Sequence, residues 1–176
     1  TTTTPYTKLP NPTTLPTGDG LDCTFNHDGT RLAVAHSTSP YITIYDTTTT
    51  PYTKLPNPTT LPTGDGLDCT FNHDGTRLAV AHSTSPYITI YDTTTTPYTK
   101  LPNPTTLPTG TGNGCAFNHD GTRLAVAHNT SPFITTYGVS PLSNAPKPFE
   151  VGDELPAGYI KISWDFTGKP VDVLHI

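Results

Sequence analysis

The hydrophobic and polar positions of this chain predict short β-strands. In the middle of the chain, Leu67, Cys69 and Phe71 alternate with Asp68 and Thr70, and a two-residue period is typical of a strand with one buried face. The letters Asn-His-Asp-Gly follow directly. They predict a tight turn, because Asn and Asp bond to their own backbone and Gly accepts unusual backbone angles. A strand followed by a hairpin turn is therefore expected here.

Three further strands are expected in the same segment. Residues 78–81 are apolar on both faces, as in a strand buried from both sides. Residues 87–91 are rich in β-branched and aromatic residues, which favour strands. Residues 98–101 form a short polar run flanked by prolines, which suits the edge of a sheet. Nothing in the segment has the 3.6-residue period of a helix, so a helical solenoid is excluded.

The whole pattern recurs along the chain. Residues 1–46 reappear letter for letter as residues 47–92, and residues 93–138 differ from them at only a few positions. A repeat of this length is typical of propellers and solenoids, in which each unit buries its apolar faces against its neighbours. Residues 139–176 match the third copy weakly, from Leu155 and again from Trp164. We therefore expect three 46-residue repeats and a degenerate fourth repeat, or C-terminal cap.

The turn and the strands around it resemble a known family. The run Phe-Asn-His-Asp-Gly-Thr-Arg-Leu-Ala-Val-Ala-His, followed by Ser-Pro-Tyr-Ile-Thr-Ile-Tyr, resembles WD-repeat-like β-propellers of the YVTN type. The linking Tyr-Thr-Lys-Leu-Pro-Asn-Pro is similar to tandem propeller repeats encoded by bacteriophages and prophages. The resemblance covers all three repeats. It implies an all-β fold, a β-propeller of four-stranded antiparallel blades with three full blades and a partial, degenerate fourth. No Trp-Asp pair ends the third strand, which departs from the WD pattern.

The repeats predicted in this way do not close a ring. Residues 3–10 match the outer strand of a preceding blade, so the chain supplies one outer strand, three blades and an inner hairpin, whereas propellers have four to eight blades. Further repeats in a longer chain could close the ring, and the missing initial Met and abrupt start favour this reading. Alternatively, several copies of the chain could close it, with the N-terminal strand of one beside the C-terminal hairpin of the next.

Composition and charge narrow the function. The chain is 32% hydrophobic and only 13% charged, and its ordered Tyr, Ile and Val runs predict a folded, turn-rich protein. Its formal net charge of -5 is spread out, without a run of Lys or Arg, so it lacks the basic surface of a nucleic-acid-binding protein. No apolar run approaches the roughly 20 residues of a membrane helix. We therefore expect neither nucleic-acid binding nor membrane insertion.

Cysteines and histidines do not have the spacing of a metal site. Cys23, Cys69 and Cys115 occur once per repeat, and we expect small buried thiols rather than a zinc cluster. Two histidines occur in each repeat, and within one blade they are too far apart along the strand to share a metal. Hydrogen bonding in turns or in the core is expected for the turn histidines His27, His73 and His119 and for the strand-end histidines His36, His82 and His128. No metal and no cofactor are expected.

The acidic residues do not form a complete catalytic set. Asp19 and Asp65 could bring carboxylates toward the central channel, but the third copy has Thr111 at this position, and Gly114 replaces Asp22 and Asp68. The broken ring of acids argues against glycosidase and calcium sites. Some YVTN-like propellers resemble lactonases, yet no Ser–His–Asp set or acid cluster distinguishes one blade. We therefore predict no catalytic residue.

The candidate binding residues lie on loops. In a propeller of this strand order, residues 57–66 and residues 83–86 reach the same face, and rigid loops of this kind often carry binding sites. Aromatic residues at its rim are candidate anchors, or ordinary strand residues that cover blade edges. The predicted binding residues are Tyr41, Tyr87, Phe133, Asp19, Asp65, Ser39 and Ser85.

These observations and the resemblance predict a non-enzymatic structural or binding module. The resemblance implies part of a phage virion protein, such as a fibre, tail or surface appendage, located on a virion or another extracellular surface. Its expected partners are other virion proteins, copies of itself, or a host-surface glycan or protein, bound through many weak contacts. The alternatives are an enzyme-like propeller, either a lactonase or a glycan hydrolase, and an engineered symmetric propeller.

Overall fold

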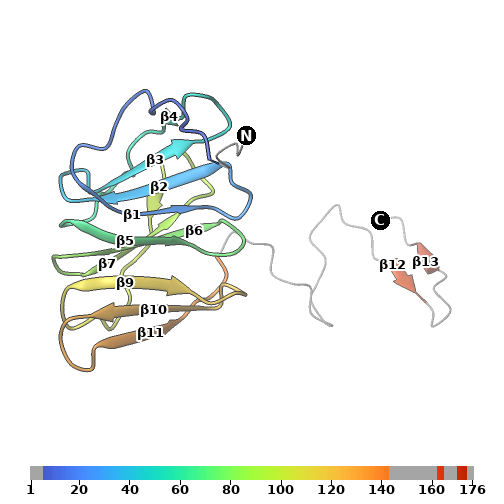
Figure 1. Cartoon of the computed structure of the whole chain (residues 1–176). Coiled ribbons are helices and arrows are strands. Elements are labelled where there is room, and N and C mark those ends of the chain that lie inside the picture. The colour runs from blue at the N-terminus through green and yellow to red at the C-terminus, as the bar shows by residue number, and fades with distance from the viewer. Residues whose placement is uncertain (1–5, 143–161, 165–169, 174–176) are drawn as a thin grey trace. The chain divides into compact units, whose positions relative to one another are not determined.

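All the elements of the protein are β-strands (Figure 1). The computed structural model describes residues 6–142, 162–164 and 170–173. The chain divides into two units, residues 1–140 and residues 141–176. Within the described residues, no helix is long and apolar enough to cross a membrane.

Three antiparallel sheets make up the first unit, and we call them blades 1, 2 and 3. In each blade the strands lie in chain order, so that each strand pairs with the next. Blade 1 consists of β1 (Gly20–Phe25), β2 (Arg31–His36), β3 (Ile42–Asp46) and β4 (Thr53–Lys54). Blade 2 consists of β5 (Gly66–Phe71), β6 (Arg77–His82), β7 (Ile88–Asp92) and β8 (Thr99–Lys100). Blade 3 consists of β9 (Gly112–Phe117), β10 (Arg123–His128) and β11 (Ile134–Gly138).

The strands confirm the all-β prediction, and their register repeats from blade to blade. Phe25 lies opposite Leu32, and the corresponding Phe71 lies opposite Leu78. The hairpin turn after the first strand is also as predicted, with Gly29, Gly75 and Gly121 at a positive φ of 71–72°. The outer strands β4 and β8 have only two residues each and are shorter than the four expected.

One prediction about an outer strand is wrong for the described residues. Residues 6–10 form no strand, although residues 3–10 were expected to be one. An outer strand needs a third strand beside it, as β4 has Tyr45 and Asp46 of β3, and the described residues hold no such neighbour for residues 6–10. Blade 3 has three strands among the described residues, and because residues 143–161 lie outside them, the expectation of a fourth strand stays a prediction.

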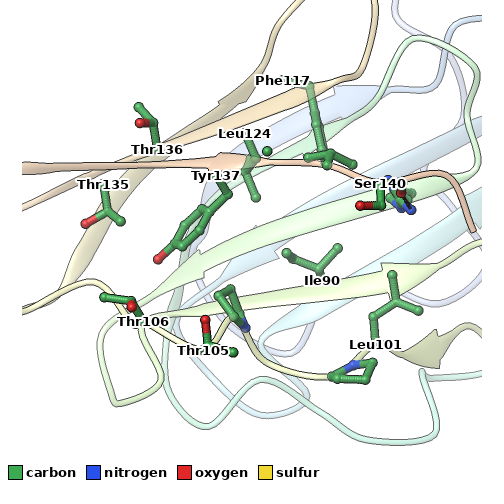
Figure 2. Close-up of a pocket in the computed structure, with 15 residues that line it drawn as sticks. Ile90, Leu101, Thr105, Thr106, Phe117, Leu124, Thr135, Thr136, Tyr137 and Ser140 are labelled. Atoms are coloured by element: carbon green, nitrogen blue, oxygen red, sulfur yellow. Dashed lines mark hydrogen bonds between the residues drawn. The ribbon is translucent and has the colours of Figure 1, made fainter.

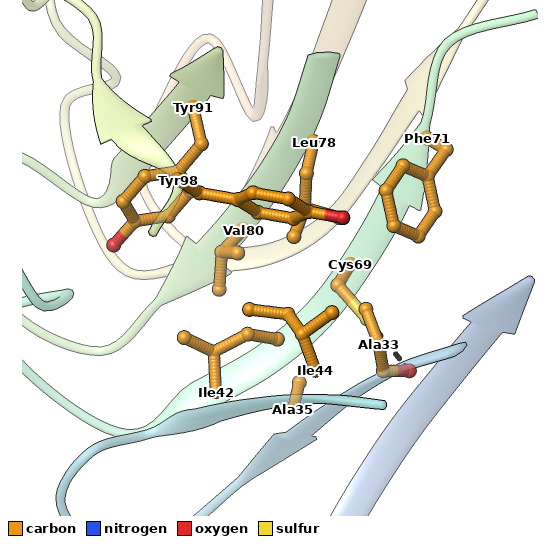
Figure 3. Close-up of a cluster of buried hydrophobic side chains, with 10 residues drawn as sticks. All are labelled: Ala33, Ala35, Ile42, Ile44, Cys69, Phe71, Leu78, Val80, Tyr91 and Tyr98. Carbon is orange, nitrogen blue, oxygen red and sulfur yellow. Dashed lines mark hydrogen bonds between the residues drawn. The ribbon is translucent and has the colours of Figure 1, made fainter. Parts of the chain in front are cut away.

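The blades stack face to face, with β1, β5 and β9 side by side (Figure 1). We call the face that a blade turns toward its successor the trailing face, and the opposite face the leading face. The trailing face of blade 1 carries Ala33, Ala35, Ile42 and Ile44, which pack against the leading face of blade 2 (Figure 3). That leading face carries Cys69, Phe71, Leu78, Val80 and Tyr91. The same contact is repeated between blades 2 and 3.

Identical residues differ in exposure because their neighbours differ. Phe71 is 9% exposed between two blades, whereas Phe25 on the leading face of blade 1 is 52% exposed. The free thiol of Cys69 is buried, that of Cys115 is half-buried, and that of Cys23 is exposed. The prediction of buried cysteines is therefore right for Cys69 and wrong for Cys23, because no blade covers the leading face of blade 1 in the described structure.

The second unit contains a two-stranded antiparallel hairpin of β12 (Ile162–Trp164) and β13 (Pro170–Val173). Ile162 lies opposite Val173 and Ser163 lies opposite Asp172. Most of the expected fourth repeat falls outside the described residues. The assignment of residues 139–176 as a degenerate repeat therefore stays a prediction.

Candidate binding face and the groups around it

Two segments meet at one end of each blade, as predicted, and form what we call the loop face. In blade 2 the hydroxyl of Thr63 donates to the carbonyl of Ser85 at 2.8 Å. The Ser83 amide donates to the carbonyl of Asp65 at 3.1 Å, and the Asp65 amide donates to the Ser83 hydroxyl at 3.0 Å. Corresponding bonds join the two segments in the other blades. The loop face comprises residues 17–19, 37–41, 63–65, 83–87, 109–111 and 129–133.

The predicted aromatic residues lie on the loop face but outside the strands. Tyr41, Tyr87 and Phe133 have positive φ values of 65°, 66° and 67° and precede β3, β7 and β11, so the view of them as ordinary strand residues is wrong. Their conformation serves blade packing, because a Cβ on Gly66 would lie 2.2 Å from the Tyr41 carbonyl oxygen. Only a glycine allows this close approach. Tyr41 and Tyr87 are half-buried, and Phe133 is 63% exposed.

The predicted polar residues also lie on this face. Ser39 and Ser85 are exposed, and their carbonyl groups accept the threonine hydroxyl bonds. Asp19 is exposed and Asp65 half-buried. Their backbones form hydrogen bonds with Ser37 and Ser83. These bonds hold both residues on the loop face.

A different pair of carboxylates comes together, Asp22 and Asp68. The Cys69 amide donates to Asp22 Oδ2 at 2.9 Å, from the blade that follows, and the Cys115 amide donates to Asp68 in the same way. Burial raises the pKa of Asp68, the bond from Cys115 opposes this, and the nearby Asp22 carboxylate raises it further. Sequence reasoning considered these acids only as an incomplete ring, although their loss at Gly114 in the last repeat was a signal of a role between blades.

The strand-end histidines are buried and hydrogen-bonded, as predicted. His82 Nε2 lies 3.0 Å from the Thr89 hydroxyl, and His36 and His128 have matching threonine partners. Burial lowers the pKa of His82 from 6.5 to about 4, although backbone hydrogen bonds partly oppose the shift. The His36 pKa is lowered in the same direction, mainly by burial.

The turn histidines behave differently from the prediction. His27, His73 and His119 are exposed, and their rings lie against one another, with centroids 4.3 Å and 4.7 Å apart. Because equivalent turns of successive blades are adjacent, the rings contact each other instead of bonding within their turns. Within the described ranges, no three His, Cys, Asp or Glu residues are arranged to hold a metal ion.

A pocket of about 510 Å³ lies between the outer parts of blades 2 and 3 (Figure 2). Its apolar wall includes Ile90, Leu101 and Phe117, and its polar groups include Arg77 and Tyr137. Sequence reasoning did not find this pocket. The available signal was that the Pro-Tyr-Thr-Lys motif of the repeats is absent after Gly138.

Comparisons with solved structures agree with this architecture. The chain is similar to a protein assigned as a 6-phosphogluconolactonase from Bacteroides fragilis, with a TM-score of 0.56 and 17% identity over 67% of this chain and 34% of that one. The counterpart from Bacteroides uniformis gives a TM-score of 0.54, 18% identity, and 67% and 35% coverage. For U3-55K the TM-score is 0.53 and the identity 16%, over 65% of this chain and 34% of that one.

The fold is that of a β-propeller. The chain spans about a third of the length of these propeller neighbours, and at such identities the likeness concerns the fold alone. No family model matches the sequence. No curated protein matches it either.

Proposed function

We propose that this propeller chain is a non-enzymatic binding and structural module, which presents its loop face to a protein or glycan on an exposed surface such as that of a phage particle. The observation that carries the proposal is the repetition of one loop architecture in three successive blades, with the same hydrogen bonds in each. Each loop offers exposed hydroxyls beside an aromatic ring. Equivalent sites at a fixed spacing bind a repetitive ligand by avidity.

The backbone of the loop face supports this role. Threonine hydroxyls bridge the two segments of each loop, and a Cβ on Gly64 would lie only 2.5 Å from the Thr84 hydroxyl. Loops that are already fixed lose little conformational entropy when they bind.

The test is retention of the full chain on a glycan array, with product formation followed on the same sugars. Replacing the rings of Tyr41, Tyr87 and Phe133 by Asn keeps a residue that tolerates positive φ. Each single variant should weaken retention a few-fold, and the triple variant by more than about 100-fold, because avidity multiplies the losses.

The matched control removes three exposed rings at the opposite ends of the strands. The triple variant of His27, His73 and His119 to Gln should keep full retention. Turnover of any bound sugar would overturn the non-enzymatic proposal. Unchanged retention by the triple Asn variant would show that the loop face is not the binding surface.

A lactonase-like activity is the second candidate. One observation favours it: the Asp68 carboxyl, beside Asp22, has a raised pKa, which suits a general acid. Sugar-lactone hydrolysis, followed by acid release, tests this directly. A rate above background that Asp68→Asn abolishes would support the enzyme, and no turnover would leave the binding module as the function.

A further inference from the structure

One tyrosine of the repeat is buried between blades 1 and 2. Tyr98, just before β8, is 5% exposed and packs with Phe71, Leu78 and Tyr91 (Figure 3). Burial raises the pKa of Tyr98. The nearby Arg31 of blade 1 partly opposes this shift. The outer strand of blade 2 therefore seals the contact with blade 1.

The corresponding space between blades 2 and 3 is the pocket shown in Figure 2. Its walls are the counterparts of the residues around Tyr98: Arg77 for Arg31, Ile90 for Ile44, Leu101 for Leu55, Phe117 for Phe71, Leu124 for Leu78 and Tyr137 for Tyr91. Ile90, Phe117 and Tyr137 are only partly buried, whereas their counterparts are buried. The pocket therefore lies where Tyr98 lies in the preceding contact.

Two polar groups at this pocket have no partner among the described residues. Arg77 is 8% exposed, and its Nε makes no hydrogen bond, although another guanidinium nitrogen donates to the Ser140 carbonyl. The hydroxyl of Tyr137 is also buried and unpaired, whereas that of Tyr91 donates to the Thr60 carbonyl at 2.9 Å. Buried polar groups are normally paired, so the unpaired Nε of Arg77, the counterpart of the Arg31 that lies beside Tyr98, points to an absent polar occupant.

The edge of blade 3 is open at the same place. In blade 2, Tyr91 pairs with Lys100 and Asp92 with Thr99, whereas β11 has no such outer neighbour in the described sheet. The amide of Thr59 donates to the Tyr98 carbonyl at 3.0 Å, and this bond has no counterpart at Thr105 within the described residues. A strand preceded by a tyrosine would pair with the free edge of β11 and would also fill the pocket.

The chain contains a free segment with the required sequence. Residues 6–9 repeat residues 98–101 letter for letter, form no strand, and carry Tyr6 at 89% exposure. These residues lead into blade 1, which blade 2 separates from the open edge of blade 3 (Figure 1). The segment that fits the edge therefore comes most directly from another molecule.

We propose that a second copy of this chain docks head-to-tail on blade 3: its residues 6–9 pair with β11 as a fourth strand, and its Tyr6 enters the pocket beside Arg77. The connection from residue 9 to blade 1 has the same letters as the connection from residue 55 to blade 2. The leading face of the second copy's blade 1 is thereby placed on the trailing face of blade 3. The exposed Phe25 and Cys23 of the second copy then gain the kind of cover that Phe71 and Cys69 have.

The new contact lacks two features of the contacts inside the chain. On the trailing face of blade 3, Thr136 stands where the other blades have Ile44 and Ile90, and Gly114 stands where they have Asp22 and Asp68. The intermolecular contact is accordingly weaker than the internal ones. Thr136→Ile should tighten association about tenfold, because it restores a buried aliphatic side chain.

Sedimentation of the full chain over a wide concentration range tests the proposal. We expect species heavier than 18.8 kDa at high concentration. Tyr6→Ala should raise the dissociation constant at least about 100-fold, since buried tyrosines dominate such contacts. Thr7→Ala is the matched control, because the equivalent Thr53 and Thr99 are exposed in their strands. Because Tyr6 is exposed in the single chain, both variants should melt at the parent's temperature in dilute solution, where none of the chains associates.

Complementation distinguishes a head-to-tail contact from a symmetric one. Tyr6→Ala leaves blade 3 intact as an acceptor, and Ile134→Asp damages the acceptor at a residue that is 54% exposed but keeps the free strand. Neither variant should associate alone, and their mixture should form a 1:1 complex. A symmetric contact gives no rescue, which would overturn the proposal.

A peptide of residues 3–12 provides an independent readout. It should bind the full chain, dissociate its oligomers, and lose both effects when its tyrosine is replaced by alanine. A chain that stays at 18.8 kDa at every concentration would overturn the proposed second copy. Association that Tyr6→Ala leaves unchanged would overturn it as well.

Discussion

At the scale of single residues, the environment decides what identical letters do. The sequence was sufficient to predict that the strand-end histidines are buried and hydrogen-bonded, because their place after an apolar strand is a local property. It was not sufficient for the turn histidines, whose contact partners are rings in the neighbouring blades. Nor did it reveal the Asp22–Asp68 pair, since no local pattern brings two residues of different repeats together.

The buried His82 makes the stability of the protein depend on pH. Its folded-state pKa of about 4 lies below the ordinary 6.5, so the unfolded chain binds the proton more readily. Stability is full above about pH 6.5 and falls as the pH drops toward 4, by up to about 3 kcal/mol for this residue. Urea unfolding at several pH values should show a smaller acid loss in His82→Gln than in the parent. His73→Gln, at an exposed ring, should keep the parent's slope.

The Asp68 carboxylate offers a second residue-scale test. Asp68→Ala removes the acceptor of the Cys115 amide and should lower the free energy of unfolding by about 1–3 kcal/mol. Asp68→Asn keeps an acceptor oxygen and removes the charge beside Asp22. At neutral pH it should therefore match or exceed the parent in stability by urea denaturation. A loss equal to that of the alanine variant would contradict the account of this pair.

At the scale of elements, strands set by local alternation were predictable and strands set by a neighbour were not. The inner strands β5 and β6 lie within one residue of the expected positions, because their patterns and the Asn-His-Asp-Gly turn are local. The outer strand is two polar residues that pair only when a third strand lies beside them. The same letters therefore form strands at Thr53 and Thr99 but none at Thr7.

The contact between blades can be measured with a matched pair of variants. Phe71→Ala removes a ring buried between blades 1 and 2 and should cost about 3–5 kcal/mol in the free energy of unfolding. Phe25→Ala makes the same change in the same local sequence, at a half-exposed ring, and should cost less than about 1 kcal/mol. Urea denaturation of dilute protein compares the two. Equal losses would mean that the leading face of blade 1 is already covered.

At the scale of the whole molecule, the repeat length and strand order made the propeller architecture predictable. The loop face followed from the same reasoning, because strand order alone decides which turns share an end of the sheet. The pocket beside Arg77 was not predictable in this way, since it lies where blade 3 has no outer strand among the described residues. Comparing the repeats in sequence indicates where the pocket lies only once it is known that Tyr98 fills the space between blades 1 and 2.

Association through Tyr6 should make the melting temperature depend on protein concentration, because assembly stabilises the folded state by mass action. Calorimetry should show a higher melting temperature for concentrated than for dilute parent chain. The Tyr6→Ala chain should melt at one temperature throughout, and so should the parent saturated with the peptide of residues 3–12.

The identity of the first two repeats has a consequence for how such a molecule changes over generations. Because every internal blade offers the same two surfaces, a whole 46-residue unit can be gained or lost by recombination between copies without creating a single unfamiliar side-chain contact. Duplication of the gene segment is then structurally silent. The number of repeats can therefore change under selection for the length of the array or for its number of binding sites, while the contacts between neighbouring blades stay the same.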